Sequence, residues 1–311
     1  MTGKAQQRIG RRFFVILMVL GGALALILAP DSARGVRSVT DFLGRRVVIP
    51  DEPRRVVALA PSITEIVYAL EQESRLAGVT RFSDYPAAAT RLPKVGSYVH
   101  LDLERIVALR PDLCIAVKDG NPKVVIDRLM QLNIPVFAVN PTNLETVIQA
   151  VEHIGRLLNT EQKAALIAAD MRARIEHVRQ QVAEVERRPR VFFQIGLAPI
   201  VSVGSATFIH ELIETAGGEN VARGDVPYPR FSREQVIGLA PDVIIITSMA
   251  RSAIFERVKA EWARWKHMPA ARNNRIIVQE SNLFDRPSPR LVQGLELLVK
   301  LIHPQLFGGS P

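Results

Sequence analysis

The first half of the chain alternates between strand-like and helix-like hydrophobic patterns. Alternating apolar residues on both sides of Asp41–Gly44 predict a β-hairpin, and Pro50 and Pro53 separate it from a buried strand. Short apolar runs then alternate with segments whose apolar residues recur at helical spacing. The predicted strands are 56–59, 76–80, 113–117 and 136–140, and the predicted helices are 61–72, 103–109 and 122–132. This order predicts an α/β lobe built on a mostly parallel sheet.

The first predicted helix carries a recognisable N-terminal signal. Ser62 and Glu65 are three residues apart at the start of an apolar helical face, which is the spacing of a capping box. We therefore expect Ser62 to be the N-cap and Glu65 to bond back to it.

The pattern changes at Asn143, because no strand signal occurs before Arg190. Segments 144–158 and 161–186 have helical apolar spacing, and a helix of about 25 residues would be roughly 38 Å long. Such a helix is long enough to connect two lobes. After it, strand and helix signals resume. The predicted organisation is an N-terminal signal or anchor (1–36), an α/β lobe (37–142), a helical linker with an interlobe backbone helix (143–189) and a second α/β lobe (190–311).

A repeated stretch supports two similar lobes. LERIVALRPDLCIA (103–116) and REQVIGLAPDVIII (233–246) align on their Pro-Asp pairs and place Glu104 opposite Glu234. In each stretch a short helix should end before the proline, since the preceding residue disfavours helical dihedrals. A buried strand follows in both.

Glu104 and Glu234 have two interpretations at this point. A carboxylate in the first helical turn gains about 0.3–1 kcal/mol from the helix dipole, and Asp102 and Ser232 are suitable caps beside them. A functional role for the two matching carboxylates is the other interpretation. The residue pattern alone leaves both interpretations open.

Composition narrows the class of protein. A chain of 311 residues with 48% hydrophobic residues can bury a large core. Its net charge of +9 is spread among acidic residues, without the basic and aromatic clustering typical of nucleic-acid binding. Cys114 is the single cysteine, which excludes a disulfide framework. The histidines lack zinc-ligand spacing, and no phosphate loop, HExxH or GxSxG motif is present, so we expect no catalysis.

The N-terminus has the layout of an export signal. Lys4, Arg8, Arg11 and Arg12 precede an apolar stretch at residues 13–29. This stretch is almost long enough to remain in the bilayer as an anchor. We expect a periplasmic protein, with anchoring to the outer face of the inner membrane left open.

Several segments together resemble a known family. They are RVVALAPSITEIVYAL, FSDYP, LERIVALRPDLCIA, VFFQIG, AGGENV, SREQVIGLAPDVIII and SPRL, spread in order over about residues 38–303. This set is similar to the periplasmic cobalamin-binding proteins of vitamin B12 ABC importers, within the helical-backbone class. The resemblance implies two α/β lobes joined by one rigid helix, a monomer, and cobalamin as transported ligand rather than cofactor. It also implies that Glu104 and Glu234 dock on the importer's permease, which works with ATPase subunits.

The same resemblance implies a ligand site in the cleft between the lobes. Its aromatic positions match Phe82, Tyr85, Tyr98 and Tyr228, while Val117 stands where a tryptophan is usual, so stacking area is lost. A C-terminal cluster matches the remaining positions. These are Asn282, Phe284, Asp285 and Arg286. Aromatic walls with a few polar side chains suit a broad apolar ring edged with amides.

Tyr98 and His100 keep a second ligand open. Phenolate and imidazole groups both ligate heme iron, and these residues are separated by one position in a predicted loop. The alternatives are therefore a heme or ferric-siderophore binding protein of the same fold, or a membrane-anchored ligand sensor.

Overall fold

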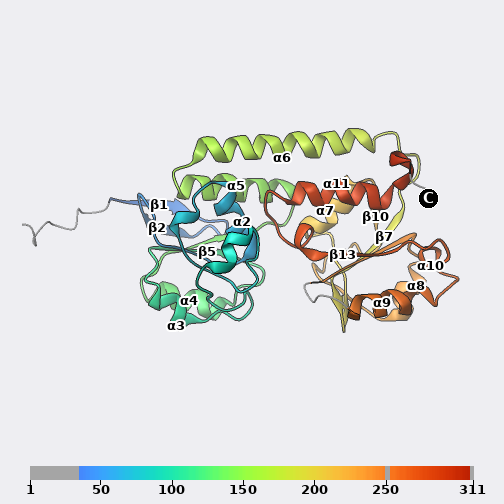
Figure 1. Cartoon of the computed structure of the whole chain (residues 1–311), viewed down its shortest axis with the longest axis horizontal. Helices are drawn as coiled ribbons and strands as arrows, with labels where there is room; N and C mark the ends of the chain where they lie inside the picture. The colour runs from blue at the N-terminus through green and yellow to red at the C-terminus, as the bar shows by residue number, and fades with distance from the viewer. Residues whose placement is uncertain (1–34, 249–252, 309–311) are drawn as a thin grey trace, which may run out of the picture.

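The computed structural model describes residues 35–248 and 253–308 and has two lobes side by side beneath one long helix (Figure 1). The apolar stretch at 13–29, predicted to direct export, lies outside the described residues. Within the described ranges, no helix combines the length and hydropathy needed to cross a membrane.

The N-terminal lobe follows the predicted order of elements. Its hairpin pairs β1 (Val36–Thr40) with β2 (Arg46–Pro50) in antiparallel register. The parallel sheet has the order β4 (Leu76–Val79), β3 (Val56–Ala58), β5 (Leu113–Val117) and β6 (Val136–Val139). The helices are α2 (Pro61–Ala69), α3 (Leu103–Ala108) and α4 (Lys123–Gln131), with short 3-10 turns at Glu73–Arg75 and Ala87–Arg91.

The C-terminal lobe repeats this topology. Its parallel sheet has the order β10 (Glu219–Asn220), β7 (Arg190–Gln194), β12 (Val243–Ser248) and β13 (Ile276–Glu280). In both sheets the first strand in the chain, β3 or β7, has the next strand of that sheet, β4 or β10, on its edge side. The remaining two strands, β5 and β6 or β12 and β13, follow in order on its other side. The helices are α7 (Phe208–Thr215), α8 (Arg233–Gly238), α9 (Ala253–Ala263), α10 (Pro269–Arg272) and α11 (Leu291–Ile302), with 3-10 turns at Ser281–Leu283 and Pro304–Phe307.

A small antiparallel sheet in the C-terminal lobe was not predicted. It consists of β8 (Gly196–Leu197), β9 (Ile200–Val201) and β11 (Arg230–Phe231). Strands of two residues carry too little periodicity to be recognised from sequence.

The repeated Pro-Asp segment makes the same contacts in each lobe. The Asp112 carboxylate accepts hydrogen bonds from the backbone at the start of β3, including Arg55 N at 2.9 Å, and Asp242 accepts one from Arg190 N at the start of β7 at 3.0 Å. In return, the Arg55 and Arg190 guanidinium groups donate to the C-cap carbonyls of α3 and α8. The predicted similarity of the lobes therefore extends to individual hydrogen bonds.

Helices α5 (Leu144–Leu157) and α6 (Glu161–Gln181) form the predicted linker. α6 spans both lobes in Figure 1, but it is five residues shorter than the predicted 161–186. The helix has Val182 as its C-cap. A turn closed by a hydrogen bond from Val185 N to the Val182 carbonyl follows, and the chain then continues to β7. Ion pairs fasten α6 at both sides: Arg172 to Glu145 of α5 at 2.6 Å, and Arg174 to Glu296 of α11 at 2.7 Å.

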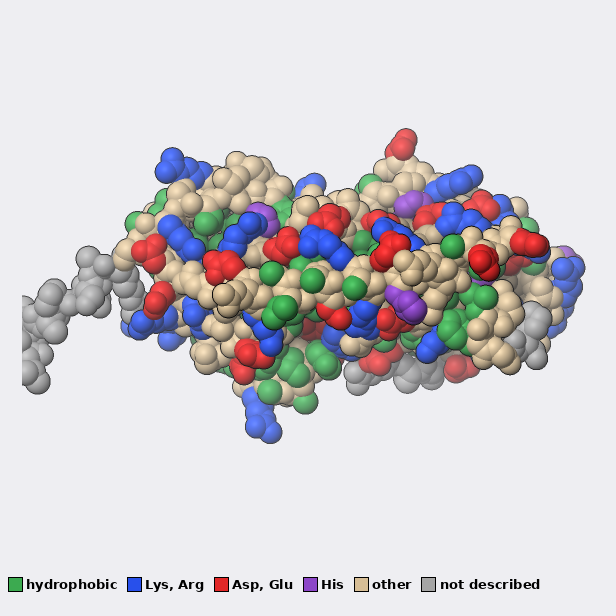
Figure 2. All heavy atoms as spheres, turned by 90° about the horizontal axis from the view of Figure 1, so that it is seen from above, with side chains coloured by type: hydrophobic (Ala, Val, Ile, Leu, Met, Phe, Trp, Pro, Cys, Tyr) green, Lys and Arg blue, Asp and Glu red, His purple; other side chains and the backbone are tan. Residues whose placement is uncertain are grey.

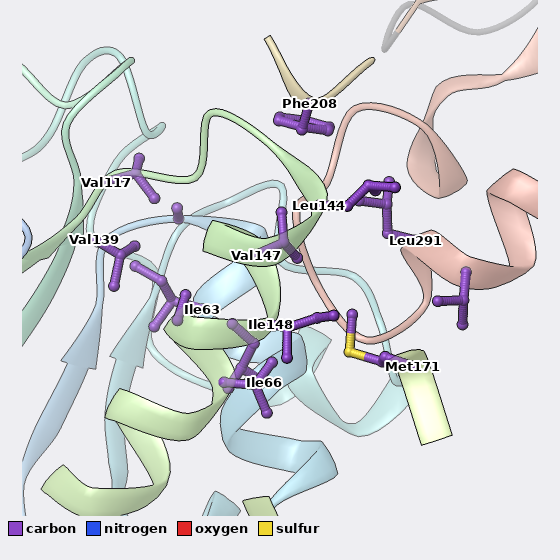
Figure 3. Packing of buried hydrophobic residues seen from close by; sticks show 14 of the residues in the cluster. Ile63, Ile66, Val117, Val139, Leu144, Val147, Ile148, Met171, Phe208 and Leu291 are labelled. Atoms are coloured by element: carbon purple, nitrogen blue, oxygen red, sulfur yellow. The ribbon is translucent and has the colours of Figure 1, made fainter. Parts of the chain in front are cut away.

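The hydrophobic core is continuous beneath α6. One cluster contains residues of α2, α5, α6, α7 and α11 and therefore belongs to both lobes. Figure 3 shows Leu144 of α5 beside Leu291 of α11, and Val147 of α5 between Leu144 and Ile63 of α2. Two separate clusters occupy the opposite faces of the sheets. The lobes are thus joined by packing as well as by one covalent helix.

The exposed surface of the molecule on the α6 side is polar and carries both positive and negative side chains. Figure 2 shows Lys and Arg side chains interspersed with Asp and Glu along it. This face presents no single-signed patch of the kind that binds nucleic acid.

Candidate functional site

A cavity of about 460 Å³ lies between the lobes. It is formed by segments that follow the carboxyl ends of the parallel strands in both sheets, where open α/β sheets bind ligands. We call it the interlobe cavity, and its volume is in the range of small-molecule sites. It is lined by Ala60, Pro61, Ser62, Tyr98, Val99, Val117, Asp119, Gly120, Asn140, Pro141, Ile195, Phe208, Ile209, Tyr228, Ser281, Asp285, Arg286 and Pro287.

Five of the residues carried over from the resemblance line this cavity. Tyr98 and Val117 come from the N-terminal lobe, and Tyr228, Asp285 and Arg286 come from the C-terminal lobe. Tyr98 and Arg286, the two that lie farthest apart in the sequence, are separated by 188 positions. The tertiary structure therefore brings together two groups that the chain keeps apart.

Two predicted ligand residues lie elsewhere in the C-terminal lobe. Phe284 is fully buried and packs edge-to-face on Phe193, with ring centroids 5.8 Å apart, so it belongs to the core. The Asn282 side chain does not line the cavity and donates instead to Glu280 at 3.0 Å. The short 3-10 turn after β13 directs these neighbours of Asp285 away from the cavity.

Two predicted aromatic residues of the N-terminal lobe also lie outside the cavity lining. The Phe82 ring is covered by the Arg81 guanidinium at 4.9 Å. The Tyr85 ring is stacked by Arg290, whose guanidinium carbon is 3.6 Å from the ring centroid. Both rings are thus engaged in cation–π contacts and do not line the cavity.

The two cavity tyrosines are held in their neutral form. Burial, and then the charge of Asp285, raises the pKa of Tyr98. Burial raises the pKa of Tyr228 to about 12, helped by Asp119, Tyr98 and Asp285. Burial likewise raises the pKa of Asp285 to about 7, although Thr247 donates to its carboxylate at 3.4 Å. The cavity therefore presents phenol donors beside carboxylates.

A buried amide holds the N-terminal wall in place. Asn121 donates to the carbonyls of Leu59 at 2.9 Å and Tyr98 at 2.8 Å, and accepts from Val117 N at 2.8 Å. Gly120 has a φ of 118°, and a Cβ there would lie 2.7 Å from the Tyr98 ring. We did not identify these residues from sequence, although an Asn next to Gly after a buried strand is a usable signal for a structured loop.

The capping box predicted for α2 is absent. Ala60 is the N-cap without a side-chain bond, and Pro61 occupies the first helical position, where its fixed φ and missing N–H are tolerated. The helix thus begins before Ser62, which lines the cavity instead.

Glu65 takes no part in a helix cap, and its carboxylate bridges the two lobes. It accepts from Arg286 at 2.9 Å, Arg290 at 3.3 Å and the Ser288 hydroxyl at 2.6 Å, and Arg286 also bonds Asp84 at 2.8 Å. We call these five residues the interlobe cluster. The Arg286 and Glu65 side chains are only 7% and 2% exposed. A buried pair of this kind is costly to break on one side.

Glu104 and Glu234 are exposed on α3 and α8, on the side of the molecule away from α6 (Figure 1). Asp102 caps α3, and Ser232 and Gln235 form the predicted capping box of α8. Hydrogen bonds from its own backbone N–H and from Ser232 lower the pKa of Glu234. The capping groups are thus present, and both carboxylates still face solvent.

Tyr98 and His100, the two candidate heme-iron ligands, lie in different surroundings. Tyr98 lines the interlobe cavity, whereas His100 is exposed and outside its lining. Among the described ranges no group of three or more His, Cys, Asp or Glu side chains is arranged to hold a metal ion.

Comparison with known proteins agrees with this architecture. Residues 56–283 match a family described as periplasmic binding protein. The chain belongs to this family. Its members bind transported solutes and are not catalytic, and the two-lobed α/β fold predicted from the sequence is confirmed.

Several relatives of this periplasmic binding protein are named for vitamin B12 or for heme. A vitamin B12-binding protein of Vibrio parahaemolyticus is 34% identical over 252 residues, which cover 80% of this chain and 90% of that protein. The structure of periplasmic vitamin B12 binding protein BtuF of Vibrio cholerae has a TM-score of 0.73 at 28% identity, covering 82% and 98%. A periplasmic heme binding protein from Pseudomonas aeruginosa reaches 0.74 at 28% identity, covering 81% and 93%.

Proposed function

We propose that this periplasmic binding protein captures cobalamin or a related corrinoid in the interlobe cavity and delivers it to an ABC permease. The observation that carries the proposal is the cavity itself, with an apolar wall and two neutral tyrosines facing it from opposite lobes. A corrin ring has a broad apolar face and a rim of amides, which phenol hydroxyls can recognise. The names of the vitamin B12-binding relatives support the same ligand.

Delivery requires a surface as well as a cavity. Glu104 and Glu234 supply matching exposed carboxylates on the two lobes, and a permease with basic residues at the same separation would be their partner. The predicted export signal places this encounter at the outer face of the inner membrane.

Heme is the second candidate, because heme-binding proteins are among the structural relatives and Tyr98 lines the cavity. A ferric siderophore is less suited, since Arg286 is the one cation on the described wall and it is already paired.

Calorimetric titration of the full-length protein in mild detergent tests the ligand. We expect one-to-one binding of cyanocobalamin and no shift of the heme Soret band in a parallel titration with hemin. Hemin binding with a Soret band that changes in a Tyr98→Phe variant, without cyanocobalamin binding, would replace the proposed ligand and leave the family unchanged.

A further inference from the structure

The charged side chains on the described wall of the interlobe cavity are mainly acidic. Asp119, in the loop after β5, and Asp285, after β13, enter it from opposite lobes. Both act on the Tyr228 phenol, so they lie within electrostatic reach of one site. Lys118 precedes Asp119 in the chain but does not line the cavity.

The cation on this wall is already neutralised. Arg286 contacts the cavity, but its guanidinium is bound to Glu65 at 2.9 Å and to Asp84 at 2.8 Å, and a further bond at 3.1 Å goes to the Phe82 carbonyl. To pair with an anionic ligand it would have to leave two carboxylates, one of them almost fully buried. Arg286 therefore contributes structure to the cavity more than positive potential.

The N-terminus of α2 is the other positive feature on the wall, through Pro61 and Ser62. A helix end carries about half a unit charge. This is less than the charge of the Asp119 carboxylate alone. Asp285, whose pKa burial raises to about 7, adds negative charge above that pH, so the summed potential is negative.

We propose that the interlobe cavity selects its ligand by charge, accepting a ring edged with uncharged amides and rejecting one edged with carboxylates. This inference rests on the proposed function and extends it, since corrinoids carry peripheral amides whereas heme carries two propionates. Asp119 and Asp285 are the residues that set the preference. A carboxylate on the ligand about 10 Å from either would weaken binding roughly tenfold at an effective dielectric constant near 20.

The test compares cyanocobalamin with a cyanocobalamin monocarboxylic acid, in which one peripheral amide has become a carboxylate. Calorimetry on the full chain in mild detergent gives the ratio of the two Kd values. For the unchanged protein we expect the acid to bind at least about tenfold more weakly. In Asp119→Asn/Asp285→Asn the ratio should fall below about threefold, whatever happens to the absolute affinity.

Two further variants make the result specific. Asp127→Asn/Asp170→Asn changes the net charge equally but on α4 and α6, outside the cavity lining, and should leave the ratio unchanged. Asp119→Asn alone alters an exposed loop and gives a partial effect even if the half-buried Asp285 site tolerates no change.

The outcomes separate the two proposals. Binding of cyanocobalamin and its acid within threefold of each other, or an unchanged ratio in both Asp119 variants, would overturn the charge selection and leave the corrinoid function standing. Absence of cyanocobalamin binding would overturn the proposed function itself, and tight hemin binding in that case would contradict the charge selection as well.

Discussion

Glu65 and Arg286 show how much a single pair of residues contributes to this molecule. They come from opposite lobes, lie 221 positions apart and meet at 2.9 Å with both side chains buried. Two guanidinium groups and a serine hydroxyl share the Glu65 carboxylate, so its oxygens are satisfied without water. Because Arg286 also lines the interlobe cavity, this pair fixes part of the cavity wall.

Glu65→Gln should destabilise the protein by about 3 kcal/mol, because it removes one of the two carboxylates that compensate the buried Arg286 and leaves only the partly exposed Asp84. Guanidinium denaturation followed by far-UV circular dichroism measures the free energy of unfolding. Glu71→Gln is the matched control, since its pair with Lys163 is exposed and should be worth at most about 1 kcal/mol. Equal losses in the two variants would show that the interlobe cluster contributes no more than a surface ion pair.

At the scale of elements, the helix–Pro-Asp–strand segment is the unit that the chain uses twice. In each copy an aspartate after the proline accepts backbone N–H groups of a neighbouring strand, and an arginine of that strand donates to the end of the short helix. The residue before each proline, Arg110 or Ala240, has a positive φ of 47° or 46°. The unit therefore fixes a tight connection between the short helix and the strand that follows it.

Asp112→Ala and Asp242→Ala should each cost about 1–2 kcal/mol, because charge-assisted bonds to backbone N–H groups are lost at an accessible site. The double variant should show the sum within about 0.5 kcal/mol, since the sites share no partner. Urea denaturation of the three variants provides the values. Asp127→Ala, which loses an exposed pair with Lys123, serves as control, and a loss no greater than its own would refute the role given to the repeat.

For the whole molecule, the continuous core under α6 and the ion pairs of α6 with α5 and α11 keep the lobes in a defined relation. That relation sets the width of the interlobe cavity. It also sets the separation of Glu104 and Glu234, which is what a two-point docking surface needs. Rigid spacing fixes register on a partner more than it adds affinity.

Glu104→Ala/Glu234→Ala should leave cyanocobalamin binding intact and abolish stimulated uptake, because the carboxylates lie on α3 and α8 outside the cavity lining. Radiolabelled cobalamin uptake into vesicles that contain the cognate permease and ATPase measures the effect. Glu161→Ala/Glu176→Ala removes the same charge from α6, on the opposite side, and should transport normally. Unchanged uptake by the Glu104/Glu234 variant would eliminate the docking proposal.

The sequence by itself determined the alternation of strands and helices, the long connecting helix and the similarity of the lobes, because these depend on local periodicity and on a repeat visible in the chain. The helix caps at Asp102 and Ser232 were equally local and were confirmed. A proline one position earlier was enough to displace the predicted cap at Ser62.

Only the tertiary structure decided which side chains line the interlobe cavity. Phe284 and Asp285 are adjacent in the chain and both follow the 3-10 turn at Ser281–Leu283, yet Phe284 lies in the core and Asp285 on the cavity wall. Glu65 became an interlobe partner rather than a cap because Arg286 reaches it from 221 positions away. Contacts between distant segments leave no periodic trace in a single sequence, so the charge of the cavity emerged only when both lobes were in place.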